Sequence, residues 1–369
     1  MHLQSGVTLL KQKKYNEAIR FFLQFLEKYP DTFDALNLLA ICYVELKDLD
    51  KAINVLETAR GVSGNDIKNL MNLGICYANT GQFQQALVCF EQSDHLSPKQ
   101  QEILNALGNT HRLLHQYDLA REKLELVLRL NPMHQNALQN LAWLELSESN
   151  EERAASYFRQ LIKTQPHNPE ILRGLGDCFV KKHRYKEAVK LYSQSLKLQP
   201  KSTGLLNSLG VVHIKQNQAE QGIDFFKRCL NLNPEHIDAK FNLGVSLQQQ
   251  GELELAREYL ESVLKNDPYR YEAYFNLVFL CKKRLLQSEL ENWQVIYDNN
   301  RNSEQSYWLA FALGRCQEQR DQFEKSFAYY QSGRKRLDNI KPYDIKSDIS
   351  RFNRIKNGKY QRKNLLKST

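Results

Sequence analysis

A period of 34 residues constrains this chain more than any other feature of its sequence. The period is clearest in residues 203–236, where Gly210, Gly222 and Pro234 stand at the eighth, twentieth and thirty-second positions. Steps of 34 residues place repeats at residues 33, 67, 101, 135, 169, 203, 237 and 271, and two extra residues precede one more repeat at residue 307. We number the positions within each repeat as slots 1 to 34. A fixed period of this length predicts stacked helical repeats rather than one globular core.

Three slots carry residue types that dictate how a repeat folds. Slots 8 and 20 are Ala or Gly in every repeat from residue 33 to residue 237, and slot 32 is Pro in every repeat from residue 67 to residue 237. Small residues let two antiparallel helices approach closely, and Pro prevents the second helix from continuing. The first repeat is partial, with Gly6, Ala18 and Pro30 at the same three slots. Each repeat is therefore predicted to be a pair of helices joined by a turn.

These slots resemble the tetratricopeptide repeat (TPR) family, and the resemblance extends over residues 1–338. It implies an all-α fold, a right-handed superhelical solenoid of about ten 34-residue helix-turn-helix repeats. Residues 339–369 lie outside the pattern and contain nine Lys or Arg against two Asp. We expect a basic C-terminal helix or tail there, with Ile345, Ile349 and Phe352 on one helical face.

Composition narrows the class of partner and the cellular location. The net charge of +9 is concentrated in the C-terminal tail, so the array lacks the basic stripe that a nucleic-acid partner requires. No apolar run is long enough to span a membrane, and the N-terminus lacks the pattern of a signal peptide. The seven cysteines are odd in number and form no CxxC motif. Because four of them recur at slot 10, we expect buried structural thiols in a cytoplasmic protein; they are Cys42, Cys76, Cys178 and Cys316.

No pattern in the sequence assembles an active site. The chain has no glycine-rich phosphate loop, no HExxH and no GxSxG, so we expect no enzyme, no cofactor and no metal. His111 and His115 are four residues apart, a spacing that occurs in metal sites. No third ligand follows at a suitable distance, and we expect both to be packing or turn residues.

Asparagine recurs at slots that would face a groove. The TPR resemblance implies a concave groove lined by slots 2, 5, 6, 9, 12 and 13. Asparagines at slots 5, 6 and 9 are Asn37, Asn72, Asn105, Asn109, Asn140, Asn207, Asn242 and Asn276. Amide side chains carry donors and acceptors, so a ladder of them can bind the backbone of an extended peptide. A similar ladder marks the TPR array of O-GlcNAc transferase; the alternative is that these amides merely face water.

Aromatic residues take over the same slots towards the C-terminal end. Slot 5 is occupied by Phe241, Phe275 and Phe311, and slot 9 by Phe279. An exposed stripe of this kind marks an interface. Alternatively, the C-terminal helix folds back and covers it.

The last repeat carries a second resemblance, to the end of the TPR region in bacterial TPR–sulfotransferase proteins. Matching residues are Phe311, Ala312, Leu313, Gly314, Glu318, Phe327, Tyr330 and Gly333, whereas Asp321, Gln322, Ser326 and Arg334 depart from that family's pattern. The sulfonate-donor loop of that family is absent from this chain. The resemblance implies a non-catalytic, substrate-presenting arm.

The sequence as a whole predicts a scaffold that binds a protein or an extended peptide in its groove. A carboxylate clamp for acidic C-termini is not expected, because no slot 5 is Lys and no slot 6 is Arg. One alternative is the TPR arm of a larger transferase, sulfotransferase-like or O-GlcNAc-transferase-like. Another is an assembly scaffold such as those of pilus or secretion machinery. The pattern specifies neither the partner nor the oligomeric state.

Overall fold

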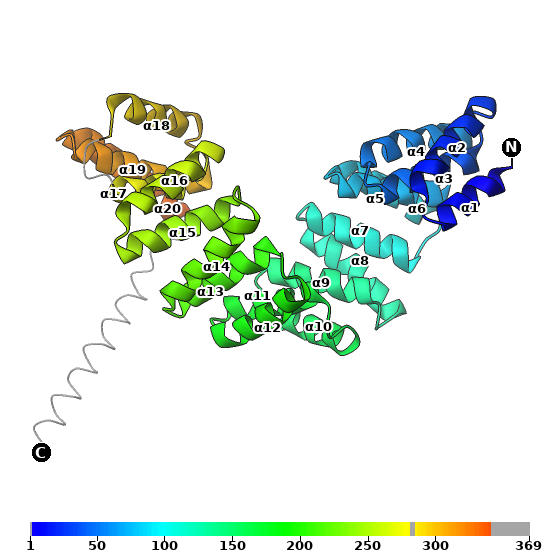
Figure 1. Cartoon of the computed structure of the whole chain (residues 1–369), viewed down its shortest axis with the longest axis horizontal. Helices are drawn as coiled ribbons and strands as arrows, with labels where there is room; N and C mark the ends of the chain where they lie inside the picture. Colours follow the sequence, from blue (N-terminus) through cyan, green and yellow to red (C-terminus); the bar gives the residue numbers. More distant parts are fainter. Residues whose placement is uncertain (1, 281–284, 341–369) are drawn as a thin grey trace, which may run out of the picture. The chain divides into compact units, whose positions relative to one another are not determined.

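The computed structural model describes residues 2–280 and 285–340, and these residues form successive pairs of helices (Figure 1). The first helices of the pairs are α1 (Leu3–Lys11), α3 (Phe33–Glu45), α5 (Ile67–Asn79), α7 (Gln101–Leu113), α9 (Gln135–Ser147), α11 (Pro169–Lys181), α13 (Thr203–Lys215), α15 (Ile237–Gln250), α17 (Tyr271–Leu280) and α19 (Tyr307–Glu318). The second helices are α2 (Tyr15–Lys28), α4 (Leu49–Ser63), α6 (Phe83–Leu96), α8 (Tyr117–Leu130), α10 (Glu151–Thr164), α12 (Tyr185–Leu198), α14 (Ala219–Leu232), α16 (Leu253–Asn266), α18 (Gln287–Asn299) and α20 (Phe323–Ile340). A short 3-10 turn, η1 (Glu304–Ser306), precedes α19. From residue 33 onward every predicted repeat start is the first residue of a helix, which confirms the helix-pair prediction.

Small residues at slots 8 and 20 allow the two helices of a repeat to approach closely. A Cβ added to Gly74 would lie 2.5 Å from a ring carbon of Phe90, the slot-24 residue of the same repeat. A Cβ added to Gly222, at slot 20, would lie 2.9 Å from the backbone oxygen of Gly210. Both distances are too short for a carbon atom, so the fold depends on these small residues.

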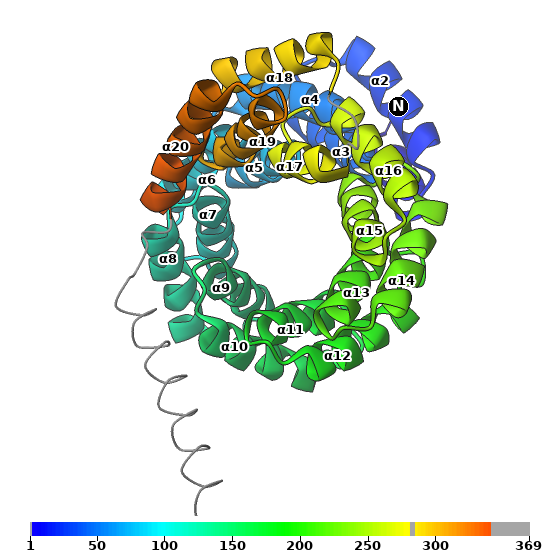
Figure 2. The ribbon, with the colours of Figure 1, turned by 90° about the vertical axis from the view of Figure 1, so that its left-hand side faces the viewer.

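The chain divides into two compact blocks, Met1–Gln199 (the N-terminal block) and Pro200–Thr369 (the C-terminal block). In the N-terminal block α7, α9 and α11 lie along one face, and α8, α10 and α12 lie along the other (Figure 2). In the C-terminal block α13 and α15 lie on one face, with α14 and α16 on the other (Figure 2). First helices therefore form one layer of each block and second helices form the other.

The repeat that starts at residue 271 departs from this helix pairing, as its sequence predicts. Leu290 occupies slot 20 and is buried, and its size prevents the usual close approach. Helix α18 packs against α19. The rings of Tyr274 on α17 and Trp293 on α18 meet edge to face, with centroids 4.8 Å apart.

The four cysteines at slot 10 are buried, as their recurrence predicts. All six described cysteines are free thiols buried between helices. Burial raises the pKa of the Cys42 and Cys76 thiols to about 11 and that of Cys178 to about 12. A raised pKa keeps the unreactive thiol form at neutral pH.

The predictions about membrane spans and about the C-terminal helix concern residues that the structure describes only in part or not at all. No helix within residues 2–280 and 285–340 has the length and apolar character of a membrane span. The predicted C-terminal helix, with Ile345, Ile349 and Phe352, lies outside the described residues. The cytoplasmic location stays a prediction.

Candidate peptide-binding groove

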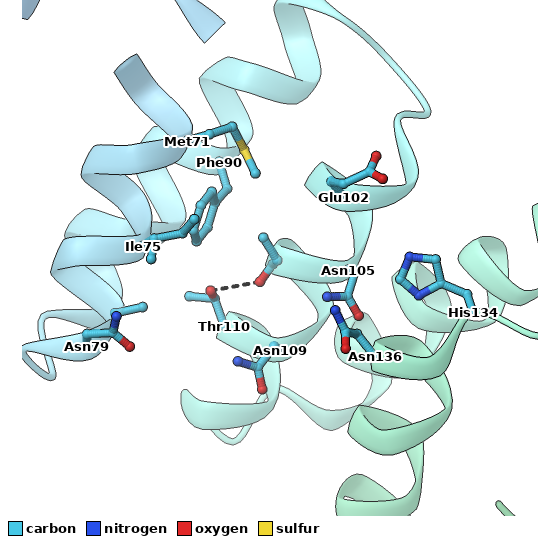
Figure 3. A pocket seen from close by; sticks show the side chains of 12 residues that line it. Met71, Ile75, Asn79, Phe90, Glu102, Asn105, Asn109, Thr110, His134 and Asn136 are labelled. Atoms are coloured by element: carbon cyan, nitrogen blue, oxygen red, sulfur yellow. Dashed lines mark hydrogen bonds between the residues drawn. The ribbon is translucent and has the colours of Figure 1, made fainter. Parts of the chain in front are cut away.

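A groove of about 350 Å³ opens in the N-terminal block between α5, α7 and the start of α9 (Figure 3). Most of its lining residues occupy the slots predicted to face a groove. From α5 they are Met71, Ile75, Ala78 and Asn79; from α7 they are Glu102, Asn105, Ala106, Asn109 and Thr110; and Asn136 comes from α9. His134 and Phe90 complete the lining. Asn105 and Asn109 are thus the two predicted site residues that this groove contains.

The groove has two chemically different walls (Figure 3). Met71 and Ile75 on α5 form an apolar wall, and Ile75 is 43% exposed. Across from them the amides of Asn105, Asn109 and Asn136 form a polar wall. An apolar surface beside a few convergent polar groups is the usual composition of a binding site.

Internal hydrogen bonds occupy the oxygens of two residues of the polar wall, Asn105 and Asn109. The Oδ1 atom of Asn105 accepts a hydrogen bond from Asn140 Nδ2 at 3.0 Å. The Oδ1 atom of Asn109 accepts one from Arg112 Nη2 at 2.9 Å. Neither Nδ2 group of Asn105 and Asn109 donates to another group in the described part of the chain. The two amides are therefore oriented to donate to a ligand.

The asparagines pair across repeats instead of forming one continuous ladder. In each pair the oxygen of a slot-5 asparagine accepts a hydrogen bond from the slot-6 amide of the next repeat. Asn105 accepts from Asn140, and Asn207 accepts from Asn242, both at 3.0 Å. Both pairs are 35 residues apart, and this spacing was the signal available in the sequence.

The other asparagines have local roles. Asn37 accepts from the buried slot-3 residue Asn69 at 3.3 Å. Asn276 donates to the backbone oxygen of Glu272 in its own helix at 2.8 Å. Asn72 is half-buried on α5, and it is absent from the residues that line the groove.

The predicted phenylalanines lie in the C-terminal block, away from this groove. Phe275 contacts Phe279 and Trp308, each with ring centroids 5.0 Å apart, and Phe279 is 54% exposed. Tyr307 then connects Trp308 to Phe311. Neither Trp308 nor Tyr307 was predicted from the sequence, although Trp308 stands at slot 2, one of the slots predicted to face the groove.

Two of the four phenylalanines have further neighbours outside this chain of rings. Phe241 lies under the guanidinium of Arg270, 4.9 Å from the ring centroid. Phe311 packs against α20, where a Cβ on Gly333 would lie 2.7 Å from its ring. The exposed part of the aromatic surface is therefore centred on Phe279.

The two histidines are packing and turn residues, as predicted. His111 is buried, with its Nδ1 atom 2.7 Å from Gln116 Oε1. His115 lies in the turn at φ 60°, with its Nδ1 atom 2.8 Å from the hydroxyl of Tyr117. Among the described residues no group of three or more His, Cys, Asp or Glu side chains could hold a metal ion.

Known proteins with similar sequences contain the same repeat. Sequence models of the tetratricopeptide repeat family match residues 9–71, 67–100, 105–169, 145–209 and 213–278. The TPR repeat-containing protein YsoA of Bacillus subtilis (strain 168) is 43% identical over 56 residues, which are 15% of this chain and 16% of that protein. This chain thus matches only a small part of that relative's length.

Solved structures share the fold at low sequence identity. The APC/C hetero-tetramer Cut9–Hcn1 superposes with a TM-score of 0.58 at 16% identity, covering 66% of this chain and 48% of that one. A tetratricopeptide repeat protein from Parabacteroides merdae ATCC 43184 gives 0.54 at 17% identity, covering 67% and 98%. The type IV pilus biogenesis factor PilW gives 0.51 at 19% identity, covering 55% and 94%. At these identities the likeness concerns the fold alone.

The matches support the general function of the array and leave one resemblance untested. Tetratricopeptide arrays are protein-interaction scaffolds, and the matches to this chain support that role in general. The resemblance of the last repeat to TPR–sulfotransferase proteins stays a prediction, as does the transferase-arm alternative that rests on it. The repeat spacing, the helix pairs and the matched residues agree, and the chain belongs to the tetratricopeptide repeat family.

Proposed function

We propose that this chain binds an extended segment of a partner protein in the groove between α5, α7 and α9. The observation that carries the proposal is the orientation of Asn105 and Asn109, whose oxygens are already bonded within the fold. Their free N–H groups would donate to backbone carbonyls, which every peptide offers whatever its sequence. An extended chain exposes such carbonyls because it forms no internal hydrogen bonds.

The spacing of the two amides suits an extended backbone. Asn105 and Asn109 are four residues apart on α7, which corresponds to about 6 Å along a helix axis. Carbonyls on one side of an extended peptide repeat every second residue, at about 6.6 Å. One peptide running along α7 could therefore bond both amides.

The apolar wall would supply affinity for a side chain of the bound segment. Ile75 and Met71 lie opposite the amides (Figure 3). In that position they would contact a side chain of the bound segment. Burial of one aliphatic side chain contributes about 1.5–3 kcal/mol. The preferred ligand is thus an extended segment with at least one aliphatic residue.

Two substitutions, made at residues of equal exposure, test the site. Ile75 on α5 lines the groove, whereas Val88 on α6 is absent from its lining, and both are 43% exposed. Peptides would be selected from a phage-displayed random library on the immobilised full chain and then measured in solution by fluorescence anisotropy. We expect Ile75→Glu to weaken binding about tenfold or more, because it places a charge on the apolar wall. Val88→Glu should leave the dissociation constant unchanged.

Thermal unfolding of both variants provides the control for folding. Equal melting temperatures would assign the loss of affinity to the groove. If both variants bind the selected peptides as tightly as the original chain, the groove is not the binding site and the proposal is wrong.

A further inference from the structure

Arg112 is a cation without an ionic partner beside this groove. It stands at slot 12 of α7, three residues after Asn109, and is not itself one of the groove-lining residues. Its Nη2 atom donates to the groove residue Asn109 at 2.9 Å. Its Nε atom is buried and has no hydrogen-bond partner among residues 2–280 and 285–340. No carboxylate in that part of the chain forms an ion pair with Arg112.

Burial makes this missing partner energetically significant. Desolvation lowers the pKa of the Arg112 guanidinium, so the fold disfavours the charge that the side chain nevertheless carries at neutral pH. A partly buried charge is stabilised by pairing. On the next helix, Arg121 pairs with Glu145 at 3.2 Å and also with Glu148. Arg112 differs from it in having no such carboxylate.

The opposite end of the groove carries the opposite charge. Glu102 lines the groove at slot 2 of α7, is exposed, and forms no ion pair within the described residues. It precedes Arg112 by ten residues on the same helix, which corresponds to about 15 Å along the axis. An extended chain covers about 15 Å in four to five residues.

We infer that the bound segment carries an Asp or Glu side chain that pairs with Arg112, and a Lys or Arg about four to five residues away that lies beside Glu102. This inference rests on the proposed function, because it assumes that the segment lies along α7. The group that Arg112 recognises is then an acidic side chain within the bound segment. Recognition of this group does not require the slot-5 Lys and slot-6 Arg that clamp a C-terminal carboxylate.

The charge pairing also sets the direction of the ligand in the groove. The acidic residue lies at the C-terminal end of α7 and the basic residue at its N-terminal end. Amide donors alone would accept a peptide in either direction, since carbonyls line both edges of an extended chain. The two charges therefore add a preference that Asn105 and Asn109 cannot supply.

A reversal of charge tests the inference on the full chain. The phage-displayed random library would be selected separately on the original chain, on Arg112→Glu and on Glu102→Lys. On the original chain we expect Asp or Glu to be enriched about four to five positions from Lys or Arg. Arg112→Glu should replace the acidic preference by a basic one, and Glu102→Lys should change only the basic position. Arg129→Glu on α8 is the control, because Arg129 is exposed, has Glu125 as an ionic partner and bonds to no groove-lining residue in the described part of the chain; it should change neither preference.

The outcomes separate this inference from the proposed function. An acidic preference that survives Arg112→Glu overturns the inference, while binding that remains sensitive to Ile75→Glu still supports the groove. Binding that is insensitive to Ile75→Glu overturns both. If Arg112→Glu does not fold, Arg112→Met replaces it: loss of the acidic preference supports the pairing, and its persistence overturns it. A selected acidic peptide should bind Arg112→Met about tenfold more weakly.

Discussion

Single contacts between slots 8 and 24 decide which residues a repeat accepts. A Cβ on Gly210 would overlap the ring of Phe226, and a Cβ on Gly176 would lie 2.5 Å from the ring of Tyr192. Where slot 8 is Ala40, slot 24 is the smaller Leu56. In these repeats the residue at slot 8 and the side chain at slot 24 complement each other in volume, whereas the repeat that starts at residue 135 combines Ala142 with Phe158.

A matched pair of glycines in α13 turns this contact into a prediction. Gly210→Ala should destabilise the chain by about 1–3 kcal/mol, because the new methyl group overlaps Phe226. Gly204→Ala in the same helix should stabilise it by about 0.5–1 kcal/mol, because a Cβ there meets nothing within 4 Å. Urea unfolding followed by circular dichroism measures both changes.

The double variant Gly210→Ala with Phe226→Leu separates overlap from other effects. It recreates the Ala40–Leu56 combination, so its stability should exceed that of Gly210→Ala alone. A double variant no more stable than Gly210→Ala alone would contradict the overlap explanation.

One further residue-scale contact explains an interruption in the asparagine pattern. Ala142 stands at slot 8 opposite Phe158, and the Phe158 ring lies against Gly174, at slot 6 of the following repeat. Any side chain at Gly174 would overlap that ring. Asparagine is therefore excluded from slot 6 of this repeat for steric reasons.

At the scale of the elements, the turn inside every repeat except the one that starts at residue 271 has a left-handed backbone at slot 15. Gly81 and Gly251 adopt φ of 78° and 87° there. Non-glycine residues occupy the same slot elsewhere, with φ between 57° and 62°; they are Lys13, Lys47, His115, Ser149, His183, Asn217 and Asp321. This conformation costs an ordinary residue about 1–2 kcal/mol.

Replacing such a residue by glycine should relieve part of that strain. We expect Lys47→Gly to raise the stability of the chain by up to about 1 kcal/mol, since the folded turn no longer carries a Cβ penalty while the unfolded chain gains some freedom. The melting temperature from circular dichroism checks this. Lys47→Ala is the control, because alanine keeps the Cβ and should not stabilise the turn. An equal gain in both variants would assign the effect to the lysine charge.

At the scale of the whole molecule, the hydrophobic core is a series of local clusters. The clusters of the N-terminal block draw all their residues from that block, for example Leu104, Leu124 and Leu141 in one cluster. A solenoid with nearest-neighbour contacts of this kind has no residue pair that must wait for a distant part of the chain.

The N-terminal block should therefore fold on its own. A fragment of residues 1–199 should keep helical circular dichroism and unfold cooperatively on heating. A fragment of residues 1–114 cuts between α7 and α8 and removes Ala120 and Leu124 from their cluster with Leu104. We expect it to aggregate or lose helicity, because its last helix exposes an apolar face. Equal behaviour of the two fragments would contradict the importance of whole repeats.

Much of the fold could be predicted because its determinants are local. The start of each helix pair from residue 33 onward follows from the spacing of small residues and prolines alone. The burial of the four slot-10 thiols follows from their recurrence, and the roles of His111 and His115 follow from the lack of a third ligand nearby in the sequence. The unusual packing of α18 could also be predicted, because Leu290 stands at the slot that a small residue occupies in the regular repeats.

The candidate site could be predicted only in part. The repeat positions predicted that Asn105 and Asn109 face the groove. They could not show that the oxygens of these two amides accept hydrogen bonds from Asn140 and Arg112. The bond between Arg112 and Asn109 lies within α7 and depends on the rotamers of two side chains three residues apart. The bond between Asn140 and Asn105 depends on how far one repeat is rotated against the next. That rotation results from side-chain volumes summed over whole interfaces.

The sequence by itself determined the all-α repeat fold, the start of each helix pair from residue 33 onward and the slots that line the groove, because these depend on residues within one period. The tertiary structure decided which amides keep free donors, that the aromatic surface is centred on Phe279, and that Arg112 has no ionic partner. Apart from the bond between Arg112 and Asn109 within α7, these features depend on contacts between repeats, where the neighbours of a side chain are 20 to 40 residues away in the chain. The chemistry of the groove is thus a property of the stacked repeats rather than of any single one.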